Sequence, residues 1–182
     1  MKVFVTDLLR FLRKPQYTAL PDHLSTSEKW LFFGRMFSVA LLTTLILSPI
    51  FSLVESLDWI SLENHAVEQV LESQPKLTVF LLIVLLAPII EELLFRAPLK
   101  FTKESRIFPF WFYLFSAVFG FVHITNYPLS VEVLLLSPLL VAPQLILGCY
   151  LGYIRIKLGL LWAILLHALY NAFFMFVTFA GQ

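Results

Sequence analysis

Long apolar runs separated by short polar segments dominate the pattern of residues along this chain. Five of these runs approach the roughly 20 residues that a helix needs to cross the hydrocarbon core of a bilayer. The pattern therefore predicts an all-α fold, a polytopic membrane helix bundle with about five transmembrane helices. We expect these helices at residues 31–54, 77–99, 107–124, 131–154 and 159–179.

The segments outside these runs are polar or amphipathic. Residues 1–14 alternate apolar and charged positions, which is typical either of an amphipathic helix on the inner leaflet or of a frayed basic tail. Residues 15–27 have the composition of a linker, and residues 55–74 form an acidic loop that includes His65. We interpret His65 and His23 as solvated, and the first span as an uncleaved anchor.

Composition and charge support a membrane protein and give its orientation. Charged residues are 14% of the chain, whereas soluble domains have about 25%. Of the 13 Lys and Arg residues, all but Lys76 fall in segments that share one side of the predicted bundle. The positive-inside rule then predicts an N-in, C-out topology. We expect a multi-pass protein of a cell membrane, of the bacterial inner-membrane type.

The second span carries acidic residues where apolar ones are expected. Glu91 and Glu92 follow a wholly apolar run, and each carboxylate at that depth costs on the order of 2.5–3.5 kcal/mol. Arg96 is one helical turn after Glu92, so these two residues are predicted to form an ion pair. Glu91 points about 100° away around the helix and is free to serve another purpose.

Two further spans carry polar pairs at the same helical spacing. Phe119 and His123 share a face of the third span, and His167 and Asn171 share a face of the fifth. A glutamate can act as a general base on water, and an amide can stabilise an oxyanion. Imidazoles can hold the water, stabilise the oxyanion or bind a metal. Two His and one Glu are also a known set of zinc ligands. The sequence therefore allows either Zn²⁺ bound by Glu91, His123 and His167 or a site without metal.

The prolines and the depths of these residues complicate this hypothesis. At 1.5 Å per residue, Glu91 lies about 24 Å and His167 about 15 Å from the basic turns. The two depths match only if the second helix continues past Arg96, which Pro98 opposes. Pro88 is expected to kink the same helix close to Glu91, and Pro138 and Pro143 to interrupt the fourth span.

Three motifs carry a resemblance to a known family. The segments Glu91–Arg96 (EExxxR), Phe119–His123 (FxxxH) and His167–Asn171 (HxxxN) occur in that order. The chain resembles the CPBP (Abi) intramembrane proteases, which include CAAX prenyl endopeptidases and bacteriocin-processing proteins.

The resemblance covers about residues 77–178 and implies a role for each motif. It implies that Glu91 is the catalytic base and that His123 helps it to activate water. His167 and Asn171 would stabilise the oxyanion, or His123 and His167 would bind metal, as in a metalloprotease. Glu92, Arg96 and Phe119 would support the site. We accordingly divide the chain into a cytoplasmic N-terminus (1–28), a first helix with its outer loop (29–76) and a catalytic membrane domain (77–178).

The functional hypothesis is an intramembrane endopeptidase that acts near the cytoplasmic half of the bilayer. Its expected partners are a peptide or protein substrate at the membrane and the lipid bilayer, with no nucleic acid. The alternatives are a non-catalytic immunity or scaffold protein of the same family and a proton carrier that uses Glu91 and Glu92. The absence of repeated halves in the sequence argues against the carrier.

Overall fold

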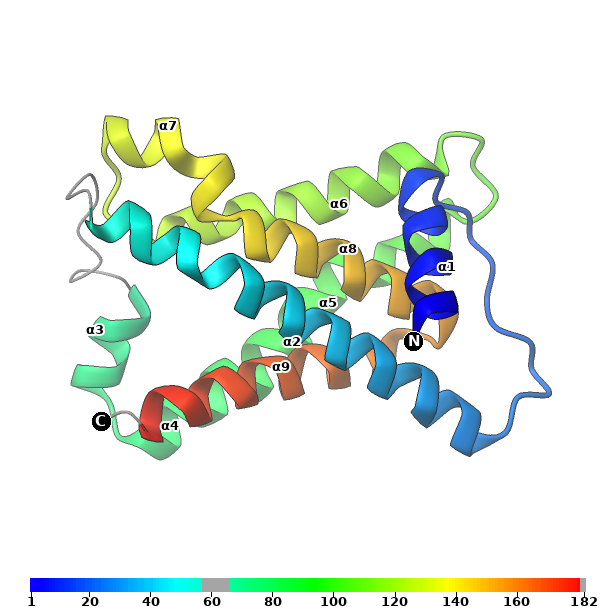
Figure 1. The fold of residues 1–182 in the computed structure, drawn as a ribbon, viewed down its shortest axis with the longest axis horizontal. Coiled ribbons are helices and arrows are strands. Elements are labelled where there is room, and N and C mark those ends of the chain that lie inside the picture. Colours follow the sequence, from blue (N-terminus) through cyan, green and yellow to red (C-terminus); the bar gives the residue numbers. More distant parts are fainter. Residues whose placement is uncertain (57–65, 181–182) are drawn as a thin grey trace.

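A computed structural model describes residues 1–56 and 66–180 of the chain (Figure 1). All regular structure within these residues is helical, which confirms the predicted all-α fold. Five stretches are long and apolar enough to cross a membrane, in agreement with the polytopic prediction. They are Thr26–Ile50, Lys76–Thr102, Phe108–Asn126, Val131–Lys157 and Leu160–Ala180. The acidic positions Asp58 and Glu63 and the predicted solvated His65 lie outside the described residues.

Several of these spans consist of more than one helical piece. The helices in chain order are α1 (Lys2–Arg13), α2 (Thr26–Ser56), α3 (Ala66–Ser73), α4 (Lys76–Phe80), the π-helix η1 (Leu81–Leu86), α5 (Ala87–Phe95), the 3₁₀-helix η2 (Ala97–Thr102), α6 (Phe108–Val122), the 3₁₀-helix η3 (His123–Asn126), α7 (Val131–Leu140), α8 (Ala142–Lys157) and α9 (Leu160–Ala180).

Helices α6 and α8 form the most extensive helix pair of the bundle and lie side by side in Figure 1. Their close approach depends on two glycines of α8. A Cβ atom on Gly152 would lie 2.7 Å from the ring of Phe112, and one on Gly148 would lie 3.0 Å from the carbonyl oxygen of Ser116. Gly148 and Gly152 form a GxxxG step in the sequence, and this step serves helix packing, as it commonly does in membranes.

The second span is the least regular of the five. In its π-helical part the amide of Ala87 donates to the carbonyl of Leu82, five residues earlier. The next amide would be that of Pro88, which has no N–H, so the carbonyl of Ile83 loses its partner within the helix. The span therefore changes from π-helix to α-helix at Pro88, and the kink predicted near Glu91 stays a prediction.

The same span ends differently from the prediction. Its α-helix stops at Phe95, so the expected α-helical continuation to Leu99 is wrong. Pro98 occupies the first turn of η2, which continues to Thr102 as a 3₁₀-helix. A 3₁₀-helix rises about 2.0 Å per residue, so the chain still advances toward the basic turn.

Prolines also divide the fourth span. It breaks at Val141 between α7 and α8, as the prolines predicted. Pro143 lies in the first turn of α8, where the missing N–H has no helical partner to lose. Pro138 lies inside α7 and removes one of its internal hydrogen bonds.

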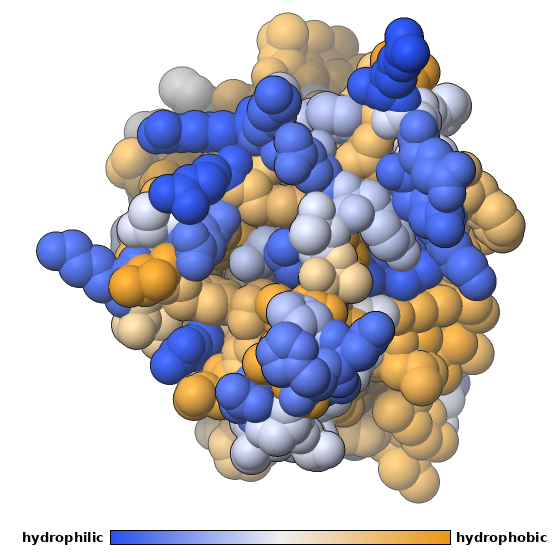
Figure 2. All heavy atoms as spheres, turned by 90° about the vertical axis from the view of Figure 1, so that its right-hand side faces the viewer, coloured by the Kyte–Doolittle hydropathy of each residue, from blue (hydrophilic) through white to orange (hydrophobic). Residues whose placement is uncertain are grey.

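Helix α1 packs at the end of the bundle where the basic turns lie. Its buried side chains Phe4, Leu8 and Phe11 contact α2, α6 and α8. The predicted helix is therefore confirmed over the frayed tail, but its apolar face packs on the bundle and not on the inner leaflet. Figure 2 looks onto this end of the molecule and shows hydrophilic side chains gathered there beside apolar flanks. We call it the basic end; α9 finishes at the other end, which we call the distal end (Figure 1).

Candidate active site

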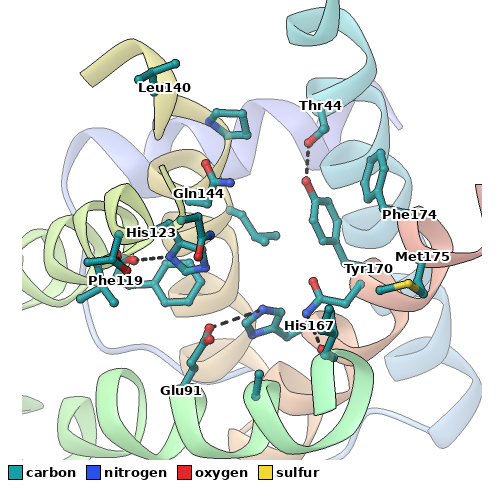
Figure 3. A pocket seen from close by; sticks show the side chains of 18 of the residues that line it. Thr44, Glu91, Phe119, His123, Leu140, Gln144, His167, Tyr170, Phe174 and Met175 are labelled. Carbon is teal, nitrogen blue, oxygen red and sulfur yellow. Dashed lines mark hydrogen bonds and ion pairs between the residues drawn. The ribbon is translucent and has the colours of Figure 1, made fainter. Parts of the chain in front are cut away.

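The adjacent glutamates of α5 face different surroundings. Glu92 is fully buried, whereas the side chain of Glu91 is 26% exposed and lines a cavity of about 610 Å³. The same cavity is lined by His123 at the end of α6 and by His167 and Asn171 of α9. Figure 3 shows that these elements turn their polar side chains toward one space. The four predicted catalytic residues are thus brought together.

Glu92 connects the basic residue of its own helix to a histidine of α9. Its Oε2 lies 3.5 Å from Nε of Arg96, which confirms the predicted ion pair. Its Oε1 lies 3.1 Å from Nδ1 of His167. Because a carboxylate only accepts, Nδ1–H of His167 donates this bond, which fixes the orientation of the ring.

Arg96 is buried and contacts three elements. Its Nη2 donates to the carbonyl of Gly148 on α8 at 3.3 Å, and its guanidinium lies 3.8 Å from the ring centre of Phe119. Its own carbonyl accepts a hydrogen bond from Nε of Arg155 at 3.1 Å. A buried charge is tolerated when it is paired and hydrogen-bonded in this way.

Glu91 is held less tightly than Glu92. Its Oε2 lies 3.7 Å from Nε2 of His167, a contact that Figure 3 shows as a dashed line. Because Glu92 contacts the other ring nitrogen, the imidazole stands between two carboxylates. The same Oε2 has no hydrogen-bond partner among the described residues. The Glu91 side chain lines the cavity, so its carboxylate keeps acceptor capacity for a water molecule or a substrate group.

His123 begins η3, directly after the last turn of α6. Its Nδ1 lies 2.8 Å from the carbonyl oxygen of Phe119, which requires Nδ1–H to donate and leaves Nε2 as the acceptor of a neutral ring. The Phe119 ring is fully buried, with its centre 5.0 Å from the ring of His123 and 5.6 Å from that of His167. Phe119 therefore packs against both imidazoles and against the guanidinium of Arg96.

Asn171 makes a contact that its sequence spacing did not reveal. Its Nδ2 donates to the carbonyl of Ile83 at 2.9 Å. This is the carbonyl that Pro88 leaves without a helical donor. Asn171 thus stabilises the π-helix that precedes Glu91, and an amide has a second N–H with which to reach into the cavity.

Other cavity residues were missed by the sequence reasoning. Gln144 of α8 lines the cavity, and its buried Oε1 has no hydrogen-bond partner in the described part of the chain. Its only sequence signal was an amide in an apolar span, one residue after Pro143. Tyr170 and Thr44 join α9 to α2 through a hydroxyl–hydroxyl contact of 2.7 Å. Tyr127 follows η3 at the cavity wall, and burial raises the pKa of its phenol.

The positions of Glu91, His123 and His167 can be compared with those that a zinc site requires. In the part of the chain that the structure describes, no three His, Cys, Asp or Glu side chains are placed to hold one metal ion. Both ring nitrogens of His167 face carboxylates, and Nδ1 of His123 faces a backbone carbonyl. This arrangement of Glu91, His123 and His167 does not fit a zinc site.

Fold and site together define a polytopic helical membrane protein with a carboxylate- and imidazole-lined cavity between its helices. Residues 73–173, which include all three motifs, match the model of the type II CAAX prenyl endopeptidase Rce1-like family. The chain belongs to this family, whose members are CAAX-type intramembrane proteases, and the resemblance seen in the sequence is confirmed. Neither the curated proteins nor the solved structures gave a match.

Proposed function

We propose that this protein is an intramembrane endopeptidase in which Glu91 activates the water that hydrolyses a peptide bond of a membrane-associated substrate. One observation carries the proposal: Glu91 lines a cavity together with two imidazoles and an amide, and its Oε2 makes no hydrogen bond within the described residues. Glu92, which is next to it, already pairs with Arg96 and His167 and is not free for this task.

The reaction begins with the water and the scissile carbonyl. Glu91, as a carboxylate, removes a proton from the water while the oxygen attacks the carbonyl carbon. His123 accepts a hydrogen bond from the same water through Nε2 and thereby orients it. The proton held by Glu91 then passes to the leaving nitrogen as the carbon–nitrogen bond breaks. A positioned general base of this kind contributes about 10²–10⁴ in rate.

The tetrahedral oxyanion needs donors on the opposite side of the carbonyl. A His167 ring protonated at both nitrogens donates to Glu92 through Nδ1 and to the oxyanion through Nε2. The second N–H of Asn171 is the other candidate donor. Loss of one oxyanion donor costs about 10²–10³ in turnover in enzymes where it has been measured.

The decisive experiment compares two glutamates in the purified, detergent-solubilised protein. Glu91→Gln is expected to lower turnover of an apolar, membrane-proximal peptide by at least about 10²-fold, because the amide cannot accept the proton. Glu104→Gln is the matched control, since Glu104 is an exposed glutamate in the turn beyond η2. Full turnover by the Glu91→Gln protein would overturn the proposal. A non-catalytic scaffold would show no turnover that depends on Glu91.

A further inference from the structure

The exposed residues that line the cavity lie toward one end of the bundle. Its exposed lining residues include Ser48 in the last part of α2, Thr125 in η3 and Thr178 near the end of α9. All three lie toward the distal end, where α9 finishes and α3 packs against η3 (Figure 1). Leu71 of α3 contributes to the same wall. These residues mark the mouth of the cavity.

The opposite side of the cavity is closed by packed side chains. Glu92, Arg96 and Phe119 form the first layer behind the catalytic residues, and each is at most 1% exposed. Each helix then continues toward the basic end through further buried residues. They are Leu99 of η2, Phe112 of α6, and Leu151 and Ile154 of α8. A water molecule or a peptide therefore has no route from the basic end through these described side chains.

The closed end is also the end that carries the basic residues. There the Lys157 ammonium donates to the carbonyl of Thr18 at 2.8 Å, and the hydroxyl of Tyr113 donates to the carbonyl of Leu12. The first contact joins the end of α8 to the α1–α2 linker, and the second joins α6 to α1. Of the 13 Lys and Arg residues in the sequence, only Lys76 starts a span from the distal end.

From these observations we infer that the cavity opens to the exoplasmic side of the membrane. The positive-inside rule places the basic, closed end in the cytoplasm. The mouth at Ser48, Thr125 and Thr178 then faces the other compartment. This orientation replaces the sequence-based expectation of cleavage in the cytoplasmic half of the bilayer.

If the protein is the proposed endopeptidase, the cavity lining also indicates which kind of peptide segment the cavity binds. Most lining side chains are apolar or uncharged, and no Lys or Arg is among the described ones. A free terminal carboxylate would find no lysine or arginine to pair with there, and it would approach Glu91. The substrate is therefore an internal, uncharged and largely apolar peptide segment that enters from the exoplasmic side. It is not the carboxyl terminus of a cytoplasmic protein.

The orientation is tested by cysteine labelling, because Cys149 is the only cysteine of the chain. In a Cys149→Ala background, Thr178→Cys reports on the mouth, and Glu104→Cys, at an exposed position of the basic end, is the matched control. A membrane-impermeant maleimide on intact spheroplasts should label the first variant and spare the second. Inside-out vesicles should give the reverse. The opposite pattern would overturn the inference, and Ser48→Cys provides a second reporter if Thr178→Cys does not accumulate.

The substrate side is tested with two anchored peptides that differ only in orientation. Each carries the same apolar segment beside a single transmembrane helix, exposed to the exoplasm in one and to the cytoplasm in the other. We expect Glu91-dependent cleavage of the exoplasmic peptide only. Cleavage of the cytoplasmic peptide alone would overturn the inference while supporting the protease. Correct labelling with neither peptide cleaved would count against the proposed function and the substrate, but not against the orientation.

Discussion

At the scale of single residues, the adjacent glutamates of α5 perform opposite tasks. Glu92 is fully buried and lies between Arg96 and His167, so its carboxylate holds these two side chains in place. Glu91 is turned about 100° around the helix and meets the cavity. One helical step thus separates a structural carboxylate from the carboxylate that we propose to be reactive. Substitutions at the two positions should therefore differ in whether they reduce stability or turnover.

We predict that Arg96→Met is strongly destabilising, because it leaves the carboxylate of Glu92 buried without its cation. Removal of one partner of a buried ion pair costs about 3–5 kcal/mol in soluble proteins. The double variant Glu92→Gln/Arg96→Met should recover part of this loss, since no buried charge is left unpaired. Thermal unfolding in detergent measures both effects in a double-mutant cycle.

Glu91→Gln provides the contrast to that cycle. It should keep the wild-type unfolding temperature while turnover is lost, because Glu91 supports no ion pair as close as that of Glu92. If the Arg96→Met protein instead has the same unfolding temperature as the wild type, the Glu92–Arg96 ion pair does not stabilise the site.

Helical spacing predicts contacts between residues of one helix, but it does not predict contacts between residues of different helices. The Glu92–Arg96 pair lies within one helix, so the i,i+4 spacing was sufficient to predict it. The contact between Glu92 and His167 joins helices that are 75 residues apart in sequence, and no local pattern encodes it. Gln144 was missed for the same reason: a single amide in an apolar span does not reveal whether it faces lipid, a neighbouring helix or a cavity.

At the scale of elements, the second span shows how a proline and an amide on another helix shape the site together. Pro88 leaves the carbonyl of Ile83 without a donor from its own helix, and Asn171 of α9 supplies one. Without a partner, a buried carbonyl costs about 1–3 kcal/mol. Asn171 is therefore tied to the backbone two turns before Glu91, whatever it contributes to the oxyanion.

We predict that Asn171→Leu lowers both stability and turnover. Adding Pro88→Ala to this variant should restore the stability but not the turnover. The alanine restores an N–H within hydrogen-bonding reach of Ile83, so the carbonyl regains a partner inside its own helix. Turnover stays low in the double variant because the amide donor of α9 is still missing. Unfolding temperature and turnover are measured on the wild type, both single variants and the double variant. Additive losses would show that the two residues act independently.

The sequence predicted the pieces of this span unevenly. A disturbance at Pro88 follows from the missing N–H of proline, and the structure shows it as a π-helix that ends next to this proline. The depth mismatch between Glu91 and His167 disappears, since their side-chain atoms lie 3.7 Å apart. The count of about 24 Å for Glu91 was too large, because residues 103–107 form a turn that adds no helical rise.

At the scale of the whole molecule, the bundle has a closed basic end and an open distal end. The five spans were predictable, because hydrocarbon thickness alone sets the length of each apolar run. The side on which the cavity opens was not, since it depends on which faces of α2, α3, η3 and α9 are left unpacked. The motifs place the site residues within membrane spans. The packing of the helices determines the end of the bundle from which a substrate can reach them.

Helix α1 should contribute to stability without contributing to catalysis, because it packs at the closed end and lines no part of the cavity. Leu8 is 2% exposed within the core, whereas its neighbour Leu9 is 52% exposed. We predict that Leu8→Ala lowers the free energy of unfolding by about 2–5 kcal/mol, the usual cost of removing a buried leucine side chain. Leu9→Ala, the matched control, should change it little. Both variants should retain the wild-type KM and kcat at temperatures where they are folded. Equal, small effects of the two substitutions would mean that α1 does not pack against the bundle, and its hydrophobic face would then have to lie in the lipid surface instead.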